Sequence, residues 1–410
     1  MNSILFRNAA LFDPARPELV PGVSVLVEGG RIREVSDRPI TSASADVVDL
    51  KGRTLMPGLI DCHVHVLASA YNLGAVAKLA NVLATLRAVP ILEGMLMRGF
   101  TTVRDAGGAD ANLVQAVETG LVRGPRIFPS GRALSQTGGH GDSRPRSDTI
   151  DTCACGQKVG AIARVVDGVD ACRLAVREEI QKGATQIKIM ASGGVASPND
   201  PIHYLGYSLD EIRAIVEEAS NSDTYVMAHA YTGRAVKRAV ECGVRTIEHG
   251  NLVDAPAAQA MAERGAIAVP TLITYEALAS EGAQLGLPAE SVAKIETARR
   301  GGLNSLEVFR AAGVPMAFGT DLLGESHRLQ SEEFRIRAEV LGAHETLRSA
   351  TLVAAQVLRR EGQLGVVAAG AVADLIVVDG DPLKDISRLL GQGDHLVAIV
   401  KDGQFVKRAL

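Results

Sequence analysis

The stretch Pro57-Gly58-Leu59-Ile60-Asp61-Cys62-His63-Val64-His65 is an apolar run that ends in two histidines separated by one residue. On a β-strand, residues at positions i and i+2 lie on the same face, so both imidazoles are expected to point the same way. Two neutral imidazoles at one strand end can bind a divalent metal ion. A lone His-x-His is also common at ordinary strand ends. Here, however, four more residues of ligand type follow apolar runs, namely Lys188, His229, His249 and Asp321.

The middle of the chain, from about residue 59 to residue 348, alternates short β-branched runs with longer helical patterns. The predicted strands are Leu59–Val64, Thr101–Arg104, Arg126–Pro129, Gln186–Met190, Tyr225–Ala228, Arg245–Glu248, Ala266–Pro270 and Pro315–Gly319. Between two of them, residues 210–219 have helical spacing of apolar residues, with Ser208 as the expected N-cap. Eight strand–helix units are what an α/β protein of the (β/α)8 TIM-barrel class requires. A doubly wound sheet is the competing fold, but no glycine-rich phosphate loop follows the first strand.

Both ends of the chain have a β pattern instead. Val23 to Val27 and Arg31 to Val35 flank Gly29-Gly30, a pair suited to a two-residue hairpin turn with positive φ. Near the C-terminus, residues 373–379 and Leu396 to Val400 are expected strands, and Asp402-Gly403 is an expected turn. We therefore predict a small β-sandwich domain composed of residues 1–56 and 355–410, and a barrel domain of residues 57–354.

Composition excludes several classes of protein. The chain has 410 residues, of which 22% are charged and 47% hydrophobic, and a net charge of −4, as in ordinary soluble globular proteins. This charge gives no reason to expect nucleic acid or an anionic membrane as a partner. No apolar run reaches the roughly 18 residues of a membrane span, and the N-terminus is unlike a secretory signal. Five scattered cysteines do not make a disulfide scaffold, so we expect reduced thiols and a cytoplasmic protein.

The ligand-type residues fall at or just past the C-terminal ends of the predicted strands. His63 and His65 end the first strand, and Lys188 lies in the fourth. His229, His249 and Asp321 end the fifth, sixth and eighth strands. Because the active site of a barrel of this kind lies at that edge, these residues are expected to converge.

In these motifs the chain resembles the amidohydrolase superfamily, in its imidazolonepropionase-like branch. Within that branch it is most similar to binuclear-zinc dipeptidases of prolidase type and to ochratoxin-cleaving amidohydrolases. The resemblance extends from the Pro57–His65 motif to residues 371–386, which include Gly-Asp-Pro-Leu-Lys-Asp-Ile. It implies two Zn2+ ions per chain, with Lys188 carboxylated by CO2 to a bridging carbamate. The implied metal ligands are His63, His65, Lys188, His229, His249 and Asp321.

The carbamate has a physical rationale. A lysine ammonium would repel the metal ions, whereas burial and nearby cations lower the lysine pKa and favour the free amine that attacks CO2. The product offers two anionic oxygens that can span two metals roughly 3.5–4 Å apart. The alternative is a lysine that extends from the strand end into solvent. We favour the ligand because Ile187 and Ile189 flank Lys188, and because mononuclear imidazolonepropionases lack this lysine.

Two acidic residues near these motifs receive different interpretations. Asp321 can ligate a metal and carry a proton from the attacking hydroxide to the leaving nitrogen. Its alternative role is a helix N-cap. Glu248 precedes His249 on the same strand and is expected to face the opposite side, as a structural residue.

Further residues are expected to contact the substrate. The glycine-rich segment 137–142 carries His140, which by resemblance polarises the scissile carbonyl; the alternative is a solvated loop histidine. Tyr231 can bind a tetrahedral oxygen or a substrate carboxylate, or can be a core tyrosine. Gly193 can supply a backbone donor, or can belong to a simple turn. Arg144, together with Arg146 on the same loop, is the weaker candidate for pairing with a substrate carboxylate.

The sequence thus predicts a binuclear zinc amidohydrolase that cleaves dipeptides or N-acyl amino acids by attack of a metal-bridging hydroxide. Xaa-Pro dipeptides are the first expectation, and this step follows from resemblance alone. The alternatives are an imidazolonepropionase-type hydrolase of cyclic amides and a non-catalytic scaffold of the same fold. A small molecule is the expected substrate, with neither nucleic acid nor a membrane as partner, and the chain is expected to form a homo-oligomer, as relatives often do.

Overall fold

The computed structural model describes residues 3–142, 144, 158–195, 197, 200–282, 284 and 289–410, the side chains of residues 289–293 excepted. Arg146, Cys153 and Cys155 lie outside the described residues. Of the described cysteines, Cys62, Cys172 and Cys242 are buried free thiols. Within the described part, none of the helices combines the length and apolar character that crossing a lipid bilayer would require.

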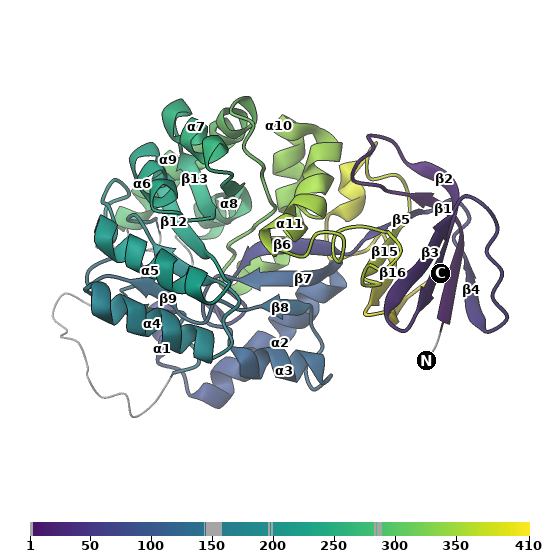
Figure 1. Ribbon diagram of the computed structural model, residues 1–410, viewed down its shortest axis with the longest axis horizontal. Coiled ribbons are helices and arrows are strands. Elements are labelled where there is room, and N and C mark those ends of the chain that lie inside the picture. Colours follow the sequence, from purple (N-terminus) through teal and green to yellow (C-terminus); the bar gives the residue numbers. More distant parts are fainter. Residues whose placement is uncertain are drawn as a thin grey trace.

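The two ends of the chain build one eight-stranded sheet, seen at the right of Figure 1 with both termini. Its strands run in the order β17-β16-β15-β5-β1-β2-β3, and β4 pairs with β1. Their bounds are β1 (Ser3–Leu11), β2 (Val20–Glu28), β3 (Arg31–Ser36), β4 (Ala45–Asp49), β5 (Thr54–Pro57), β15 (Leu375–Val378), β16 (Leu396–Lys401) and β17 (Gln404–Arg408). Segments more than 300 residues apart in sequence therefore pair side by side.

The two predicted turns of this sheet are confirmed. Glu28 pairs with Arg31 across Gly29-Gly30, whose φ values are 58° and 80°. Lys401 pairs with Gln404 across Asp402-Gly403, with φ values of 49° and 73°. Two consecutive positive φ values are the signature of the type I′ turn, whose twist matches that of the flanking strands. These local residues fix the register of both hairpins.

The rest of the chain is α/β with parallel strands, in two sheets. The three-stranded sheet has the order β6-β7-β8, and the six-stranded sheet has the order β10-β9-β11-β12-β13-β14. Their bounds are β6 (Leu59–Val64), β7 (Phe100–Asp105), β8 (Arg126–Phe128), β9 (Ala133–Ser135), β10 (Ala163–Val165), β11 (Ile187–Met190), β12 (Val226–Thr232), β13 (Thr246–Leu252) and β14 (Ile267–Val269). Seven of the eight predicted strands are therefore present. The observed start of each lies within one or two residues of the predicted start.

The predicted strand at Pro315–Gly319 forms only an isolated parallel bridge, between Met316 and Ala268. The carbonyls of Ser349 and Ala350, at the end of the helix that follows this segment (Glu332–Ser349), accept hydrogen bonds from the amides of Phe318 and Ile60. These amides would otherwise pair with a neighbouring strand, so a regular ladder cannot form. The segment still joins the two sheets, because Ala317 donates to Ala268 and Cys62 donates to Phe318, both at 2.8 Å.

Helices follow most of the parallel strands. Their bounds are α1 (Leu73–Ala77), α2 (Asn81–Met97), α3 (Ala111–Glu118), α4 (Val169–Gln181), α5 (Leu209–Asn221), α6 (Gly233–Glu241), α7 (Ala255–Glu263), α8 (Leu272–Glu281), α9 (Ala289–Ala311), α10 (Glu332–Ser349) and α11 (Leu352–Val357). Helix α5 begins as predicted: the Ser208 side chain accepts from the Glu211 amide, and the Glu211 side chain accepts from the Ser208 amide. This capping box satisfies two backbone donors that the first helical turn leaves unpaired.

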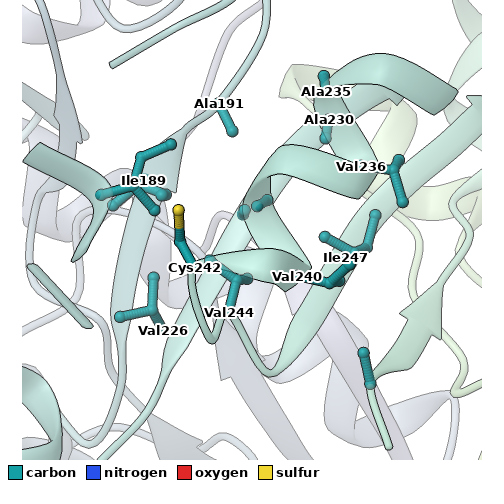
Figure 2. Close-up of a cluster of buried hydrophobic side chains, with 14 of the residues drawn as sticks. Ile189, Ala191, Val226, Ala230, Ala235, Val236, Val240, Cys242, Val244 and Ile247 are labelled. Atoms are coloured by element: carbon teal, nitrogen blue, oxygen red, sulfur yellow. The ribbon is translucent and has the colours of Figure 1, made fainter. Parts of the chain in front are cut away.

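The largest apolar core lies between the six-stranded sheet and its helices (Figure 2). Ile187 and Ile189 of β11 and Ile247 of β13 contribute to it, and Val236 and Val240 of α6 pack against them. Because side chains alternate along a strand, Lys188 of β11 points to the opposite face. Burial of one face against helices thus gathers the polar residues of the strands on the other.

Two glycine variants test how tightly the two hairpin turns of the terminal sheet contact each other. Gly403 lies in one of these turns, and Gly22, in β2, is the control. Gly403 and Gly22 have nearly the same φ, 73° and 74°. A Cβ at Gly403 would lie 2.8 Å from the Cα of Gly30, whereas a Cβ at Gly22 would have no neighbour within 4 Å. Gly22→Ala should lower the free energy of unfolding by about 1–2 kcal/mol, because alanine is strained in the left-handed conformation. Gly403→Ala should lower the free energy of unfolding by roughly 1–3 kcal/mol more, because its Cβ would clash with Gly30.

Chemical denaturation of both variants, followed by circular dichroism, measures this difference. Equal midpoints for Gly403→Ala and Gly22→Ala would contradict a tight contact between the two turns.

Candidate metal centre

The six residues expected to be ligands meet at one cavity of about 110 Å3. They come from the ends of β6, β11, β12 and β13 and from the segment that follows Pro315–Gly319. His63, His65, Lys188, His229, His249 and Asp321 all line it, together with His140. The structure thus brings together residues up to 258 positions apart, counted from His63 to Asp321.

The polar atoms in this cavity lie close enough to share a cation. The Lys188 Nζ lies 3.4 Å from His63 Nε2. The Asp321 Oδ1 lies 3.2 Å from His65 Nε2 and 3.5 Å from His63 Nε2, and its Oδ2 lies 4.0 Å from His249 Nδ1. His63, His249 and Asp321 each offer a ligand atom within 4.8 Å of the others. This spacing is what several ligands of one divalent ion require.

Each of the four histidines has one ring nitrogen bound to an oxygen atom outside the set of six. The pairs are His63 Nδ1 with Glu248 Oε2 at 2.7 Å, His65 Nδ1 with the Gly107 carbonyl at 3.2 Å, His229 Nε2 with the Gly193 carbonyl at 3.2 Å, and His249 Nδ1 with Thr271 Oγ1 at 2.8 Å. Such a bond fixes the ring and its tautomer and leaves the second nitrogen to coordinate, as in metal-binding histidines generally. The donor set therefore fits a divalent metal.

Protonation states in the cavity favour metal binding as well. Burial lowers the pKa values of His63, His229 and His249 well below their usual range, and neighbouring histidines and Lys188 lower them further. Burial also lowers the pKa of Lys188, which is 1% exposed, to about 8. Neutral imidazoles and a lysine that loses its proton readily do not repel a cation.

The carboxylate of Asp321 and the remaining histidine, His65, affect each other's pKa values in opposite directions. Burial alone would raise the pKa of Asp321, but the nearby His63, His65 and Lys188 outweigh it and lower the value to about 2. Burial opposes the charged form of His65, yet its contact with Asp321 raises the His65 pKa. Asp321 is therefore ionised near neutral pH and supplies the negative charge of the cluster.

Two of the six residues have backbone conformations that are rare for residues other than glycine. The φ values are 72° for His249 and 52° for Asp321, both in the left-handed region. Such a conformation costs about 1–3 kcal/mol and persists only where surrounding contacts hold it. It turns each side chain toward the cavity, His249 from within β13 and Asp321 from the segment after Pro315–Gly319.

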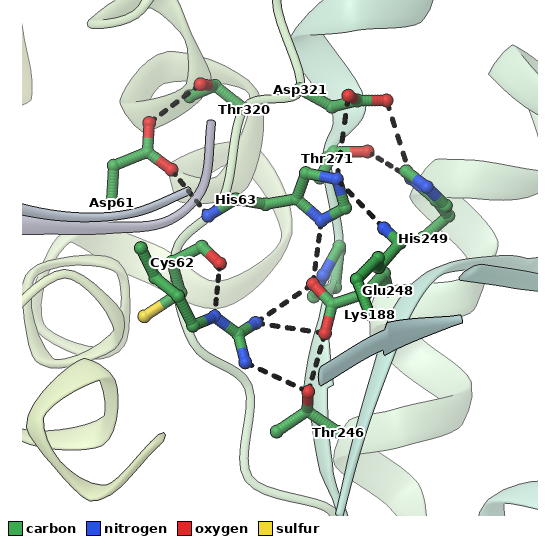
Figure 3. Close-up of polar contacts among 12 residues, drawn as sticks. Asp61, Cys62, His63, Lys188, Thr246, Glu248, His249, Thr271, Thr320 and Asp321 are labelled. Carbon is green, nitrogen blue, oxygen red and sulfur yellow. Dashed lines mark hydrogen bonds and ion pairs between the residues drawn. The ribbon is translucent and has the colours of Figure 1, made fainter. Parts of the chain in front are cut away.

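The expectation that Glu248 faces away from the site is wrong. Its side chain is fully buried, and its Oε2 accepts the hydrogen bond from His63 Nδ1, as Figure 3 shows. Strict alternation fails here because His249 leaves the extended conformation directly after Glu248. Both side chains can therefore reach the centre from adjacent positions.

Arg104 binds Glu248 from the other side and was not identified from the sequence. Its Nη2 donates to both Glu248 oxygens at 2.9 and 3.0 Å, its Nη1 to Thr246 Oγ1 at 3.1 Å, and its Nε to the Cys62 carbonyl at 2.7 Å. Arg104 is fully buried in β7. A charged residue in an otherwise uncharged predicted strand, Thr101–Arg104, is the signal that could have identified it.

Asp61 is a second residue that sequence reasoning missed. Its Oδ1 accepts from the His63 amide at 3.0 Å, and its Oδ2 accepts from Thr320 Oγ1 at 2.7 Å and from Gln330 Nε2 at 2.9 Å. Burial raises the Asp61 pKa to about 6 against these hydrogen bonds. Asp61 thus ties the start of the His63 motif to the residue before Asp321.

His140 lies at the cavity, stacked on His229 with ring centroids 4.3 Å apart. Its Nδ1 contacts Ser197 Oγ at 2.6 Å and Asp200 Oδ2 at 3.1 Å, and Asp200 is almost completely buried. A Cβ at Gly194 would lie 2.0 Å from the His140 ring, so only glycine leaves room for this placement. The contact with Asp200 leaves the second nitrogen of His140 for the cavity.

The other three substrate candidates have partners within the chain and do not line the cavity in the described residues. The Tyr231 hydroxyl is 2.7 Å from that of Tyr275, and its ring stacks on His249. Gly193 donates its amide to the Tyr204 carbonyl at 2.9 Å. Arg144 Nε donates to Asp142 Oδ1 at 2.7 Å. Contact of Tyr231, Gly193 or Arg144 with a substrate stays a prediction.

Comparisons of the sequence and of the structure with known proteins agree on one family. The sequence profile described as the Amidohydrolase family matches residues 54–406. Ochratoxinase of Aspergillus niger is 33% identical over 367 residues, which cover 86% of this chain and 75% of that protein. A prolidase solved in complex with N-methylphosphonate-L-proline is 61% identical, with a TM-score of 0.98 and coverage of 99% of this chain and all of that one. A Xaa-Pro dipeptidase with methionine bound in its active site is 30% identical, with a TM-score of 0.88 and coverage of 99% and 100%.

The role of Glu248 can be tested with a conservative substitution. Glu248→Gln removes the charge that faces Arg104 and replaces one of the two acceptor oxygens with an NH2 group, which cannot accept from His63 or Thr246. Metal affinity, measured by chelator competition, should fall about 10–100-fold, as is typical when a residue behind a ligand is lost.

Glu333→Gln is the matched control. Glu333 is also fully buried and paired with an arginine, Arg337, at 2.7 Å, but among the described residues it contacts no histidine. It should lose stability without losing metal affinity. If Glu248→Gln binds metal as the unaltered chain does, Glu248 has only a packing role.

Proposed function

The chain belongs to the amidohydrolase family and is a hydrolase acting on amide bonds, and we propose that it cleaves Xaa-Pro dipeptides at a two-zinc centre. The observation that carries this proposal is the convergence of four histidines, Asp321 and the buried Lys188 on one cavity. The 61% identical prolidase, solved with a phosphonate analogue that contains L-proline, supports proline as the residue after the cleaved bond.

We propose His63, His65, Lys188, His229, His249 and Asp321 as the metal ligands. Lys188 supports two metals rather than one, because its Nζ lies among imidazoles, and no carboxylate forms an ion pair with it in the described part of the chain. An uncharged Lys188 amine can attack CO2, forming an N–C bond and releasing one proton to give an anionic carbamate. That group has two oxygens and can bind one ion with each.

Metal ions held by these residues would supply Lewis acidity, which polarises a carbonyl group and lowers the pKa of water. Asp321 is ionised near neutral pH, and its carboxylate oxygens are therefore free to take the proton that the attacking water loses. It can then give this proton to the proline nitrogen, which must gain one to leave as an amine. The position of Asp321 at the cavity, 22% exposed, allows contact with a substrate.

His140 and Tyr231 are proposed to bind the substrate beside the metals. A protonated His140 can donate from one nitrogen to Asp200 and from the other to the carbonyl oxygen as negative charge develops there. If Tyr275 donates to the Tyr231 oxygen, the Tyr231 hydrogen is available for a substrate carboxylate or a tetrahedral oxygen. Gly193 and Arg144 stay weaker candidates.

We also propose that the parallel strands close as a (β/α)8 barrel of residues 57–354, beside a β-sandwich domain of residues 1–56 and 355–410. Backbone hydrogen bonds support closure at the points where ladders are missing. Thr185, before β11, donates to the Pro129 carbonyl after β8, and Cys62 of β6 donates to Phe318. Met316 bridges to Ala268 of β14.

The zinc-loaded protein should hydrolyse Xaa-Pro dipeptides. We expect kcat/KM for Xaa-Pro to exceed that for the matched Xaa-Ala dipeptide by at least about tenfold, the discrimination that pocket fit alone can supply. Amino acid release measured for both series, and for N-acetyl amino acids and imidazolone propionate, separates the candidates. Turnover of imidazolone propionate without dipeptide hydrolysis, or inactivity of protein that holds two zinc ions, would exclude the proposal.

Lys188→Ala should lose metal and nearly all turnover. The loss of metal affinity should exceed the roughly 10–100-fold that residues behind the ligands contribute. Short carboxylates added in solution should restore part of the activity, because they replace the bridging oxygens. Metal content and rates with and without added formate measure this, with the exposed Lys237→Ala as control. Normal zinc content in Lys188→Ala would remove the carbamate from the mechanism.

A further inference from the structure

A second cavity, of about 420 Å3, lies at the opposite end of β12, β13 and β14 from the metal centre. His229 and His249 lie toward the C-terminal ends of β12 and β13, whereas this cavity is lined by residues at the strand starts and the turns before them. The lining residues that matter here are Tyr225, Arg245, Arg264 and Arg359, with a floor of valines. Neither the proposed hydrolysis nor the metal centre uses this cavity.

Three guanidinium groups line the cavity without a carboxylate within 4.0 Å in the described residues. Arg245 and Arg359 both lie over the Tyr225 ring, 5.5 and 5.2 Å from its centroid. Within the described residues, the Arg245 side chain donates to the Gln356 carbonyl at 2.8 Å and the Arg359 side chain to the Asp223 carbonyl at 2.7 Å. The two guanidinium groups repel each other: beyond the effect of burial, Arg359 lowers the Arg245 pKa, and the carboxylate of Glu361 acts in the opposite direction.

The Nε of Arg245 is buried and has no hydrogen-bond partner in the structure. A buried donor of this kind costs free energy, and such an atom in a native protein calls for an explanation. Burial lowers the Arg245 pKa, and the neighbouring Arg359 lowers it further. An anion in the cavity would accept from Arg245 and compensate the repulsion.

The floor of the cavity is apolar. Val216, Val226, Val240 and Val244 line it, and Val226, Val240 and Val244 appear together in Figure 2. A volume of about 420 Å3 lies within the usual range for small-molecule sites and exceeds what a single inorganic ion fills. The preferred ligand should therefore carry an apolar body as well as a charge.

We propose that this cavity binds a small organic anion, with its phosphate or carboxylate group at Arg245, Arg264 and Arg359 and its apolar part on the valines. Guanidinium groups suit this role because their donors match the geometry of phosphate and carboxylate oxygens. Tyr225, Arg104 and Glu248 separate the site from His63, with the Tyr225 hydroxyl 3.5 Å from Arg104 Nη1.

Direct binding of phenyl phosphate to the zinc-loaded protein, measured by calorimetry, tests this site. Phosphates also bind metal centres, so we expect two classes of site in the unaltered chain. Arg264→Gln should weaken one class about 10–100-fold, the effect of losing one charge-assisted contact, and leave the other unchanged. The exposed Arg264 has no side-chain hydrogen bond or ion pair in the described residues, so this variant should keep the stability of the parent.

Arg359→Gln is the second variant, and Arg213→Gln, an exposed arginine of α5, is the control. Inorganic phosphate should bind the same class more weakly than phenyl phosphate, because it cannot occupy the apolar floor, and benzoate distinguishes a carboxylate from a phosphate ligand. A single class of site, or phenyl phosphate binding equally well to Arg264→Gln, Arg359→Gln and the parent, would overturn the proposal. Neither outcome depends on which substrate the metal centre hydrolyses.

Discussion

The buried ion pair between Arg104 and Glu248 determines where the first histidine of the metal centre lies. Arg104 comes from β7, Glu248 from β13 and His63 from β6, so three separate strands are joined through one carboxylate. Desolvating such a pair is costly, and an apolar replacement of the same size is often no less stable. Its value here is therefore positional: Glu248 holds Nδ1 of His63 and leaves Nε2 for the centre.

The rest of the centre depends on a division of each strand into two faces. Side chains such as Ile187 and Ile189 pack against helices, and Lys188 between them is left on the inner face among histidines. Burial away from water disfavours the charged form of Lys188 and lowers its pKa to about 8. The uncharged amine can therefore act as a nucleophile near neutral pH. The apolar core thus produces the chemistry of the site indirectly, by excluding water from it.

The same strands carry two different binding environments at their ends. The C-terminal ends of β12 and β13 present neutral imidazoles that suit cations, and the starts of β12 to β14 present guanidinium groups that suit anions. Left-handed residues mark the first environment, because His249 and Asp321 turn inward where their segments end. Such strain is kept at functional sites, where other contacts compensate it.

The sequence by itself determined the positions of seven parallel strands, the two glycine-containing hairpins, the cap of α5 and the six residues that converge on the cavity, but not the short strands β9 and β10. These follow from local rules, namely side-chain periodicity, turn residues with positive φ and the common edge of parallel strands. The inward position of Glu248 and the missing ladder at Pro315–Gly319 were decided by tertiary structure. Glu248 and His249 both face the site because the left-handed φ of His249 breaks the alternation directly after Glu248. The ladder is interrupted because Ser349 accepts the hydrogen bond of the Phe318 amide and Ala350 accepts that of the Ile60 amide. Both depend on contacts between segments distant in sequence, which no local pattern contains.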